Sequence, residues 1–209
     1  VALKKVNTGN IEVIGASAFQ GCVALDDITY SQKLETIGAS AFQGCTALIN
    51  VVIPETVYYI NDSAYADCAN LETVLLPTDI RTIGASAFVN CAKLKGIDLN
   101  RELLTSIGAS AFQGCVEFKS VYIPDGVKAL FTSTFDGCIN LAEVRLPEDF
   151  NTFETAAFKG CVALKEIIIP EKVVVLPESL FADCTALTKV DIKGSLTNVG
   201  AMAFANCPN

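Results

Sequence analysis

Apolar positions recur along the whole chain with a fixed period. The clearest copies are the nonapeptide Ile-Gly-Ala-Ser-Ala-Phe-Gln-Gly-Cys at 14–22, 37–45 and 107–115. Aligned on its last residue, the pattern places each cysteine 23 residues after the one before, with a single interval of 24. A constant period of this length predicts a solenoid, in which each repeat buries its apolar face against its neighbours. The repeats are residues 1–22, 23–45, 46–68, 69–91, 92–115, 116–138, 139–161, 162–184 and 185–207.

The first part of a repeat reads Leu-x-x-Ile-x-Ile-Pro, as in residues 164–170. Apolar positions two residues apart lie on one face of a strand, and the β-branched residues found there suit a pleated surface. Proline cannot donate to a sheet ladder, so it ends the strand. The remainder, x-x-Val-x-x-Ile-Gly-x-x-Ala-Phe-x-x-Cys, is too short for a long helix. We therefore expect one strand per repeat, a turn, a second short extended piece, and one helical or 3₁₀ turn around Ala-Phe.

Aligned repeats form columns that predict the core. One column is aromatic and predicts a ridge of stacked rings: Phe19, Phe42, Tyr65, Phe88, Phe112, Phe135, Phe158, Phe181 and Phe204. The cysteine column predicts small, buried, free thiols. Disulfides between coils are not expected, because parallel side chains keep the Cβ atoms about 4.8 Å apart, beyond the ~3.8 Å that is usual for a disulfide.

Composition narrows the chemistry that the chain can perform. No apolar run approaches the ~20 residues needed to span a bilayer, so no membrane insertion is expected. A net charge of −8 disfavours nucleic acid and anionic lipid as partners. The chain has no histidine and no Cys-x-x-Cys pair, and it lacks a glycine-rich phosphate loop. We therefore expect no metal, no cofactor, no catalytic residue and no enzymatic activity.

The outward strand positions vary from repeat to repeat, which marks them as positions that the fold does not dictate. Between the two isoleucine positions stand the apolar or basic residues Val52, Leu75, Tyr122, Arg145 and Ile168. Ordinary β-propensity on an exposed strand accounts for them in one interpretation. In the other they form a ligand-binding strip of aromatic and aliphatic anchors, with Arg145 beside Tyr122.

Two further features have competing interpretations. A column after the proline is acidic: Glu55, Asp79, Glu102, Asp125, Glu148, Asp149 and Glu171. In one interpretation these are solvated turn residues, and in the other they form a cation site or a binding surface for a basic partner. Tyr58 and Tyr59 form an aromatic pair at a turn position that is normally polar, and they are secondary candidates for contact with a ligand.

The repeat with its strand, Ile-Gly, Ala-Phe and Cys positions resembles the BspA-like, or Treponema-type, class of leucine-rich repeats along the whole chain. This resemblance implies a right-handed, curved α/β solenoid of about nine coils as a single domain over residues 1–209. It places a parallel sheet on the concave face and short 3₁₀ or turn segments on the convex side. It also implies an extracellular or cell-surface location and a role in adhesion. The polar end caps of such solenoids are absent, so we expect a fragment, with end-to-end self-association through the uncapped termini as an option.

Three functions remain open on the sequence. The favoured one is a non-enzymatic recognition or adhesion module whose concave face binds a protein, such as a host or matrix protein, or a glycan. The second is a stiff structural spacer in a larger surface protein. The third is a consensus or engineered repeat scaffold without a native ligand.

Overall fold

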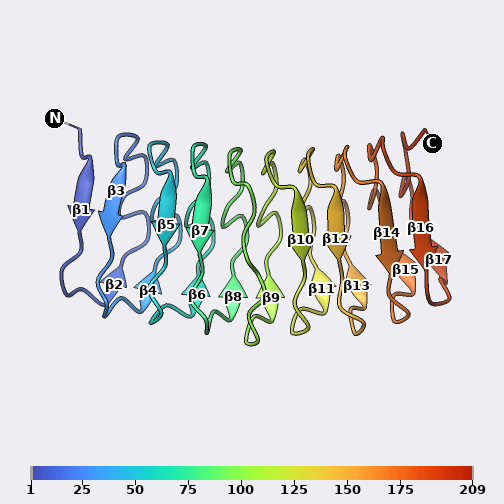
Figure 1. The fold of residues 1–209 in the computed structure, drawn as a ribbon, viewed down its shortest axis with the longest axis horizontal. Helices are drawn as coiled ribbons and strands as arrows, with labels where there is room; N and C mark the ends of the chain where they lie inside the picture. Colours follow the sequence, from blue (N-terminus) through green and yellow to red (C-terminus); the bar gives the residue numbers. More distant parts are fainter. Residues whose placement is uncertain (1, 209) are drawn as a thin grey trace.

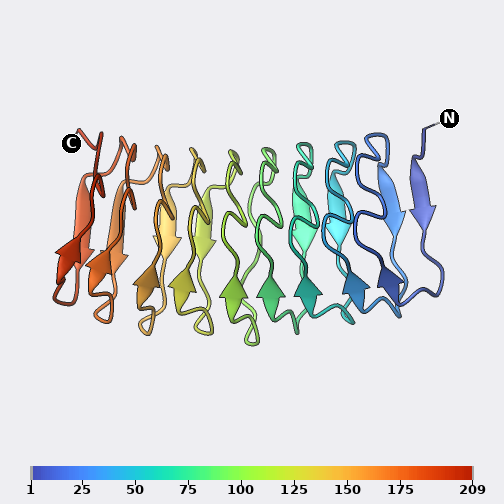
Figure 2. The ribbon, with the colours of Figure 1, turned by 180° about the vertical axis from the view of Figure 1, so that it is seen from behind.

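The computed structural model describes residues 2–208 as a row of side-by-side coils with the two termini at opposite ends (Figure 1). Two rows of parallel strands run along the array. The first row contains β1 (Lys5–Asn7), β3 (Asp27–Thr29), β5 (Asn50–Val52), β7 (Thr73–Leu75), β10 (Ser120–Tyr122), β12 (Glu143–Arg145), β14 (Glu166–Ile169) and β16 (Lys189–Ile192). The second row contains β2 (Val13–Ile14), β4 (Thr36–Ile37), β6 (Tyr59–Ile60), β8 (Thr82–Ile83), β9 (Ser106–Ile107), β11 (Ala129–Leu130), β13 (Thr152–Phe153), β15 (Val175–Leu176) and β17 (Asn198–Val199). The first row is nearer the viewer in Figure 1 and the second row in Figure 2, so the rows form two layers. The predicted solenoid of parallel-strand coils is confirmed.

The first row is divided into pairs of strands. Its hydrogen-bonded pairs within residues 2–208 are β1–β3, β5–β7, β10–β12 and β14–β16, whereas the second row begins with the five-stranded sheet β2-β4-β6-β8-β9. The fifth coil, residues 92–115, forms no first-row strand. There the carboxylate of Asp98 accepts hydrogen bonds from the backbone N–H of Asn100 (3.0 Å) and from Arg101 (2.8 Å). This local turn competes with sheet pairing, so the fifth coil lacks the strand that was expected in every repeat.

The continuous hydrogen-bond ladder of the molecule runs through the turn segment that contains Ala-Phe. In the second coil the N–H groups of Ser40, Phe42 and Gly44 donate to carbonyls of the next coil at 2.8–2.9 Å, and the N–H groups of residues 41, 43 and 45 donate to carbonyls three residues earlier. Three inter-coil bonds of this kind recur at each of the eight junctions between coils in residues 2–208. The nonapeptide is therefore the spine of the solenoid, because its backbone groups are paired with the next coil along the whole chain.

Two residues of each spine segment have left-handed backbone conformations, such as Ser40 with φ 55° and Gly44 with φ 72°. Left-handed residues four positions apart interrupt the right-handed conformation that an α-helix requires. The segment is accordingly a run of turns, and no helix occurs in residues 2–208. The turn segments expected beside the strands are therefore present, and the helical or 3₁₀ turn expected around Ala-Phe is not formed.

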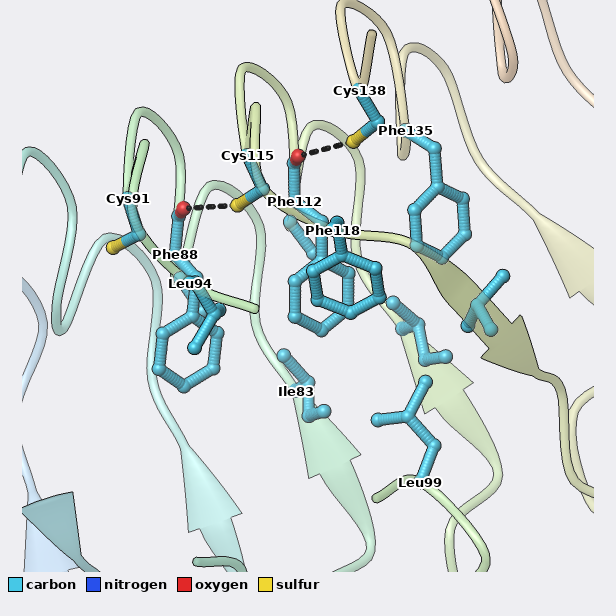
Figure 3. Packing of buried hydrophobic residues seen from close by; sticks show 14 of the residues in the cluster. Ile83, Phe88, Cys91, Leu94, Leu99, Phe112, Cys115, Phe118, Phe135 and Cys138 are labelled. Atoms are coloured by element: carbon cyan, nitrogen blue, oxygen red, sulfur yellow. Dashed lines mark hydrogen bonds between the residues drawn. The ribbon is translucent and has the colours of Figure 1, made fainter. Parts of the chain in front are cut away.

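The aromatic column is the centre of the core, as predicted. All nine rings stack in sequence, with neighbouring centroids 5.2–5.9 Å apart and ring planes within 19° of parallel. Figure 3 shows Phe88, Phe112 and Phe135 side by side in successive coils. This column joins the coils through apolar contact in the way that the spine joins them through hydrogen bonds.

The cysteines form a second column beside the rings, and all nine are free thiols. Seven are buried, whereas Cys22 and Cys207 in the end coils are half-buried. Each thiol from Cys45 onward donates a hydrogen bond to the carbonyl of the aromatic residue in the preceding coil, as Cys115 does to Phe88 at 3.2 Å (Figure 3). Burial raises the pKa of Cys45 to about 11 and that of Cys68 to about 12, so these groups stay protonated donors at neutral pH.

Candidate ligand-binding surface

The residues proposed for ligand binding project outward from the first row of strands. Val52 lies opposite Leu75 in the β5–β7 pair, and Tyr122 lies opposite Arg145 in the β10–β12 pair. Val52, Leu75 and Ile168 are 60%, 60% and 57% exposed, because their strand neighbours fill the core and alternate residues of a strand face opposite sides. The expected exposure is confirmed, and ligand binding by these residues stays a prediction.

Tyr122 and Arg145 form an ordered pair. The Arg145 Cζ atom lies 4.9 Å from the centroid of the Tyr122 ring, and the Arg145 Nε donates to Glu143 Oε1 at 2.9 Å. The guanidinium is thus held between an aromatic face and a carboxylate, which limits its rotation. Because Arg145 occupies one face of the ring, Tyr122 offers a partner its other face and its edge.

The candidate residues fall into two separate groups. Val52 and Leu75 are aliphatic neighbours in coils three and four. Tyr122, Arg145 and Ile168 belong to coils six to eight, and the fifth coil, with its turn at Asp98, lies between the two groups. The structure therefore brings together the last three candidates but not all five.

Two adjoining hollows lie beside the second group and share Arg145 and Ile168. One, of about 290 Å³, extends over Glu143, Glu166 and Asp191. The other, of about 600 Å³, extends over Pro170, Glu171 and Lys193. Four charged residues that line these hollows were not predicted from the sequence: Glu143, Glu166, Lys189 and Lys193. Glu143, Glu166 and Lys189 could have been found from their position in the repeat. Each stands two residues before the outward strand position between the two isoleucines, and strand alternation puts residues two apart on the same face.

Tyr58 and Tyr59 lie elsewhere. Tyr59 belongs to β6 in the second row, and Tyr58 precedes it. The Arg81 Cζ atom lies 5.3 Å from the centroid of the Tyr58 ring. This second ring–guanidinium pair is therefore separate from the candidates on the first row.

The acidic column after the proline includes residues with structural partners. Glu55 Oε2 accepts hydrogen bonds from the backbone N–H and the hydroxyl of Thr78, both at 2.8 Å, and these bonds lower the pKa of Glu55. Asp149 forms ion pairs with Lys172 and Lys128, which lower its pKa. These contacts join neighbouring coils, and a structural role of this kind accounts for the two residues.

Residues 2–208 show neither a metal-binding cluster nor a membrane-spanning helix. Within residues 2–208 no group of three or more histidine, cysteine, aspartate or glutamate side chains is arranged to hold a metal ion. The same residues contain no helix that is long and apolar enough to span a membrane.

Comparison with known proteins places the repeat in a family. The BspA type leucine rich repeat region matches residues 2–105 and 105–209, in six copies. Among solved structures, a leucine-rich repeat protein from Bacteroides ovatus is similar over 100% of this chain (27% identity, TM-score 0.78), and the chain spans 60% of that protein. The T. pallidum leucine-rich repeat protein is similar over 77% of this chain and 78% of its own length (31% identity, TM-score 0.71). No curated protein matches the chain. The chain belongs to the BspA-type leucine-rich repeat family.

Proposed function

We propose that this chain is a non-enzymatic recognition module that binds a protein or glycan ligand on the outward face of its first strand row. The observation that carries the proposal is the group formed by Tyr122, Arg145 and Ile168. Aromatic and arginine side chains are the residues that most often contribute large binding energies at interfaces. Here an oriented guanidinium and an exposed aliphatic side chain line two adjoining hollows, and a partly exposed tyrosine ring lies against the guanidinium.

A location outside the cell or on its surface accompanies this proposal. Membership of the BspA-type family supports it, and a module that binds matrix or host proteins needs access to them. The buried thiols are compatible with an oxidising environment, because each cysteine from Cys45 to Cys184 is shielded from solvent and held in a hydrogen bond to a carbonyl.

A second candidate is a stiff spacer that positions other domains. It is favoured by the spine, which repeats its three inter-coil hydrogen bonds at every junction described. The two functions make different predictions about the strand face, because a spacer has no ligand-sensitive residue there.

Binding to a defined set of probes tests the proposal. The purified chain is applied to a glycan array and to immobilised collagen, fibronectin and laminin. The double variant Tyr122→Ser/Arg145→Ser should lower saturable binding at least tenfold without changing the unfolding midpoint, since both side chains are on the surface. The matched control is Tyr58→Ser/Arg81→Ser, which removes the same type of pair from the other layer.

The pattern of loss distinguishes the possibilities. Loss of binding in Tyr122→Ser/Arg145→Ser alone supports a ligand site on the first strand row. Loss in the control alone moves the ligand to the secondary candidates. Absence of saturable binding to any probe favours the spacer.

A further inference from the structure

The two hollows beside Arg145 and Ile168 form one groove across coils seven to nine, called here the β12–β14 groove. Arg145 and Ile168 line both hollows, so the two are continuous with each other. The groove coincides with a break in the first row. β12 pairs with β10, and β14 pairs with β16, but no strand pairing joins β12 to β14 in the described residues.

The charges of the groove are unbalanced. Five carboxylates and three cations line it, which leaves an excess of two negative charges. Two of the cations already have partners: Arg145 pairs with Glu143, and Lys193 Nζ lies 2.8 Å from Asp191 Oδ2. Glu148, Glu166 and Glu171 form no ion pair in the part of the chain that the structure describes, and the whole chain is also acidic, at −8.

The acidic and apolar parts of the groove are adjacent. Glu148 and Glu171 occupy the same position of successive coils and both line the larger hollow, which also contains Leu146, Ile168 and Pro170. Ile168 is 57% exposed. A cationic side chain between the two glutamates would therefore lie next to an aliphatic contact.

A protein segment fits this arrangement better than a neutral glycan does. None of the residues that line the two hollows is aromatic, so the groove itself offers a neutral sugar no ring to pack on. The excess of carboxylates favours a basic group and repels acidic sugars and nucleic acid.

We propose that the β12–β14 groove binds a protein segment in which a lysine or arginine neighbours a large aliphatic residue, an inference that rests on the proposed recognition function. The basic side chain pairs with Glu148 and Glu171, and the aliphatic one covers Ile168. The two glutamates thus select a partner with a positive charge, and the exposed Ile168 provides the apolar contact for the partner's aliphatic side chain.

A peptide array with reversed charges in the protein tests this assignment. Each spot carries a glycine-serine peptide with two copies of one dipeptide: Lys-Leu, Arg-Leu, Glu-Leu, Ser-Leu or Lys-Ser. The parent chain should retain Lys-Leu and Arg-Leu spots at least tenfold over Glu-Leu, with Ser-Leu and Lys-Ser weaker than Lys-Leu. The variant Glu148→Lys/Glu171→Lys should lose this preference and retain Glu-Leu instead. The matched control, Asp79→Lys/Asp125→Lys, reverses two exposed charges of the same loop column outside the groove and should stay within twofold of the parent.

Four results would overturn the inference. The first is equal retention of Lys-Leu and Glu-Leu by the parent. The second is an equal loss in the control variant, which would show attraction to overall negative charge only. The third is a glycan or matrix probe whose binding is lost in Tyr122→Ser/Arg145→Ser and unchanged in Glu148→Lys/Glu171→Lys, an outcome that keeps the recognition function and removes the groove as its site. The third variant, Ile168→Ser, should weaken Lys-Leu binding more than Lys-Ser binding, and an equal effect on both would also count against the assignment.

Discussion

Replacing Phe88 by alanine should lower the free energy of unfolding by about 3–5 kcal/mol. Phe88 is fully buried, and its ring stacks between Tyr65 at 5.6 Å and Phe112 at 5.7 Å. Removing the ring loses its burial and leaves a cavity in a column that is fixed from both sides. The two stacking contacts, at about 0.5–1.5 kcal/mol each, lie within that range and are not added to it.

Phe204 provides the matched control at the end of the same column. Its ring is half-buried and has one stacked neighbour, Phe181, at 5.6 Å. Phe204→Ala should therefore cost about half as much as Phe88→Ala, on the order of 2 kcal/mol. The two variants remove the same atoms, so their difference reports the coupling of the ring to coils on both sides.

Urea denaturation measures both values. Far-UV circular dichroism and tyrosine fluorescence are recorded on the same samples in the presence of a reductant, and coincident transitions establish that a single free energy applies. The shift of the midpoint multiplied by the slope m gives the loss of stability. A loss in Phe88→Ala that is no larger than in Phe204→Ala would refute the proposition that the aromatic column holds the coils together.

Three further predictions follow from the core. Tyr65→Phe should lower the free energy of unfolding by about 1–3 kcal/mol, because it leaves the buried hydroxyl of Tyr30 without its 2.8 Å partner. Tyr30→Phe/Tyr65→Phe should recover most of that loss in the same urea assay. Equal stability of the parent, the single variant and the double variant would contradict a structural role for the pair. In the native state an aromatic disulfide reagent should label the half-buried Cys22 and Cys207 and leave the seven buried thiols unmodified for as long as the protein stays folded, with mass spectrometry as the readout. Burial raises the pKa of Cys45 to about 11. The protonated Cys45 thiol therefore contributes its full stabilisation of the folded state below the unfolded thiol pKa of about 8.5, and this stabilisation should fall as pH rises from about 8.5 through 11. Over this pH window the urea midpoint should decline less in Cys45→Ala than in the parent.

The period of the sequence was sufficient to predict the coil, the aromatic column and the buried thiols, because each of these repeats. The left-handed residue before each cysteine was also visible in principle. That position holds only glycine, aspartate or asparagine: Gly21, Gly44, Asp67, Asn90, Gly114, Gly137, Gly160, Asp183 and Asn206. These residue types tolerate positive φ, so the column predicts a turn in place of the helical turn that was expected around Ala-Phe.

The division of the first strand row was not predictable from the same pattern. The strand in coil five is replaced by hydrogen bonds from Asn100 and Arg101 to the side chain of Asp98, which depend on three residues meeting in one turn. Proximity of Tyr122 and Arg145 followed from register, since both occupy one column in successive coils. The orientation of Arg145 did not, because it also depends on Glu143 in the neighbouring column.

Spine and strand face are therefore specified by different constraints. In the nonapeptide, backbone N–H groups have partners in the next coil, and the ring and thiol fill a fixed space, so the fold accounts for the residue types found there. At the outward strand positions the same backbone accepts Val52, Leu75, Tyr122 and Arg145 in otherwise matched coils. Folding does not explain why carboxylates outnumber cations around Ile168. For that reason, the residues of the β12–β14 groove should be determined by the chemistry of a basic ligand rather than by the stability of the solenoid.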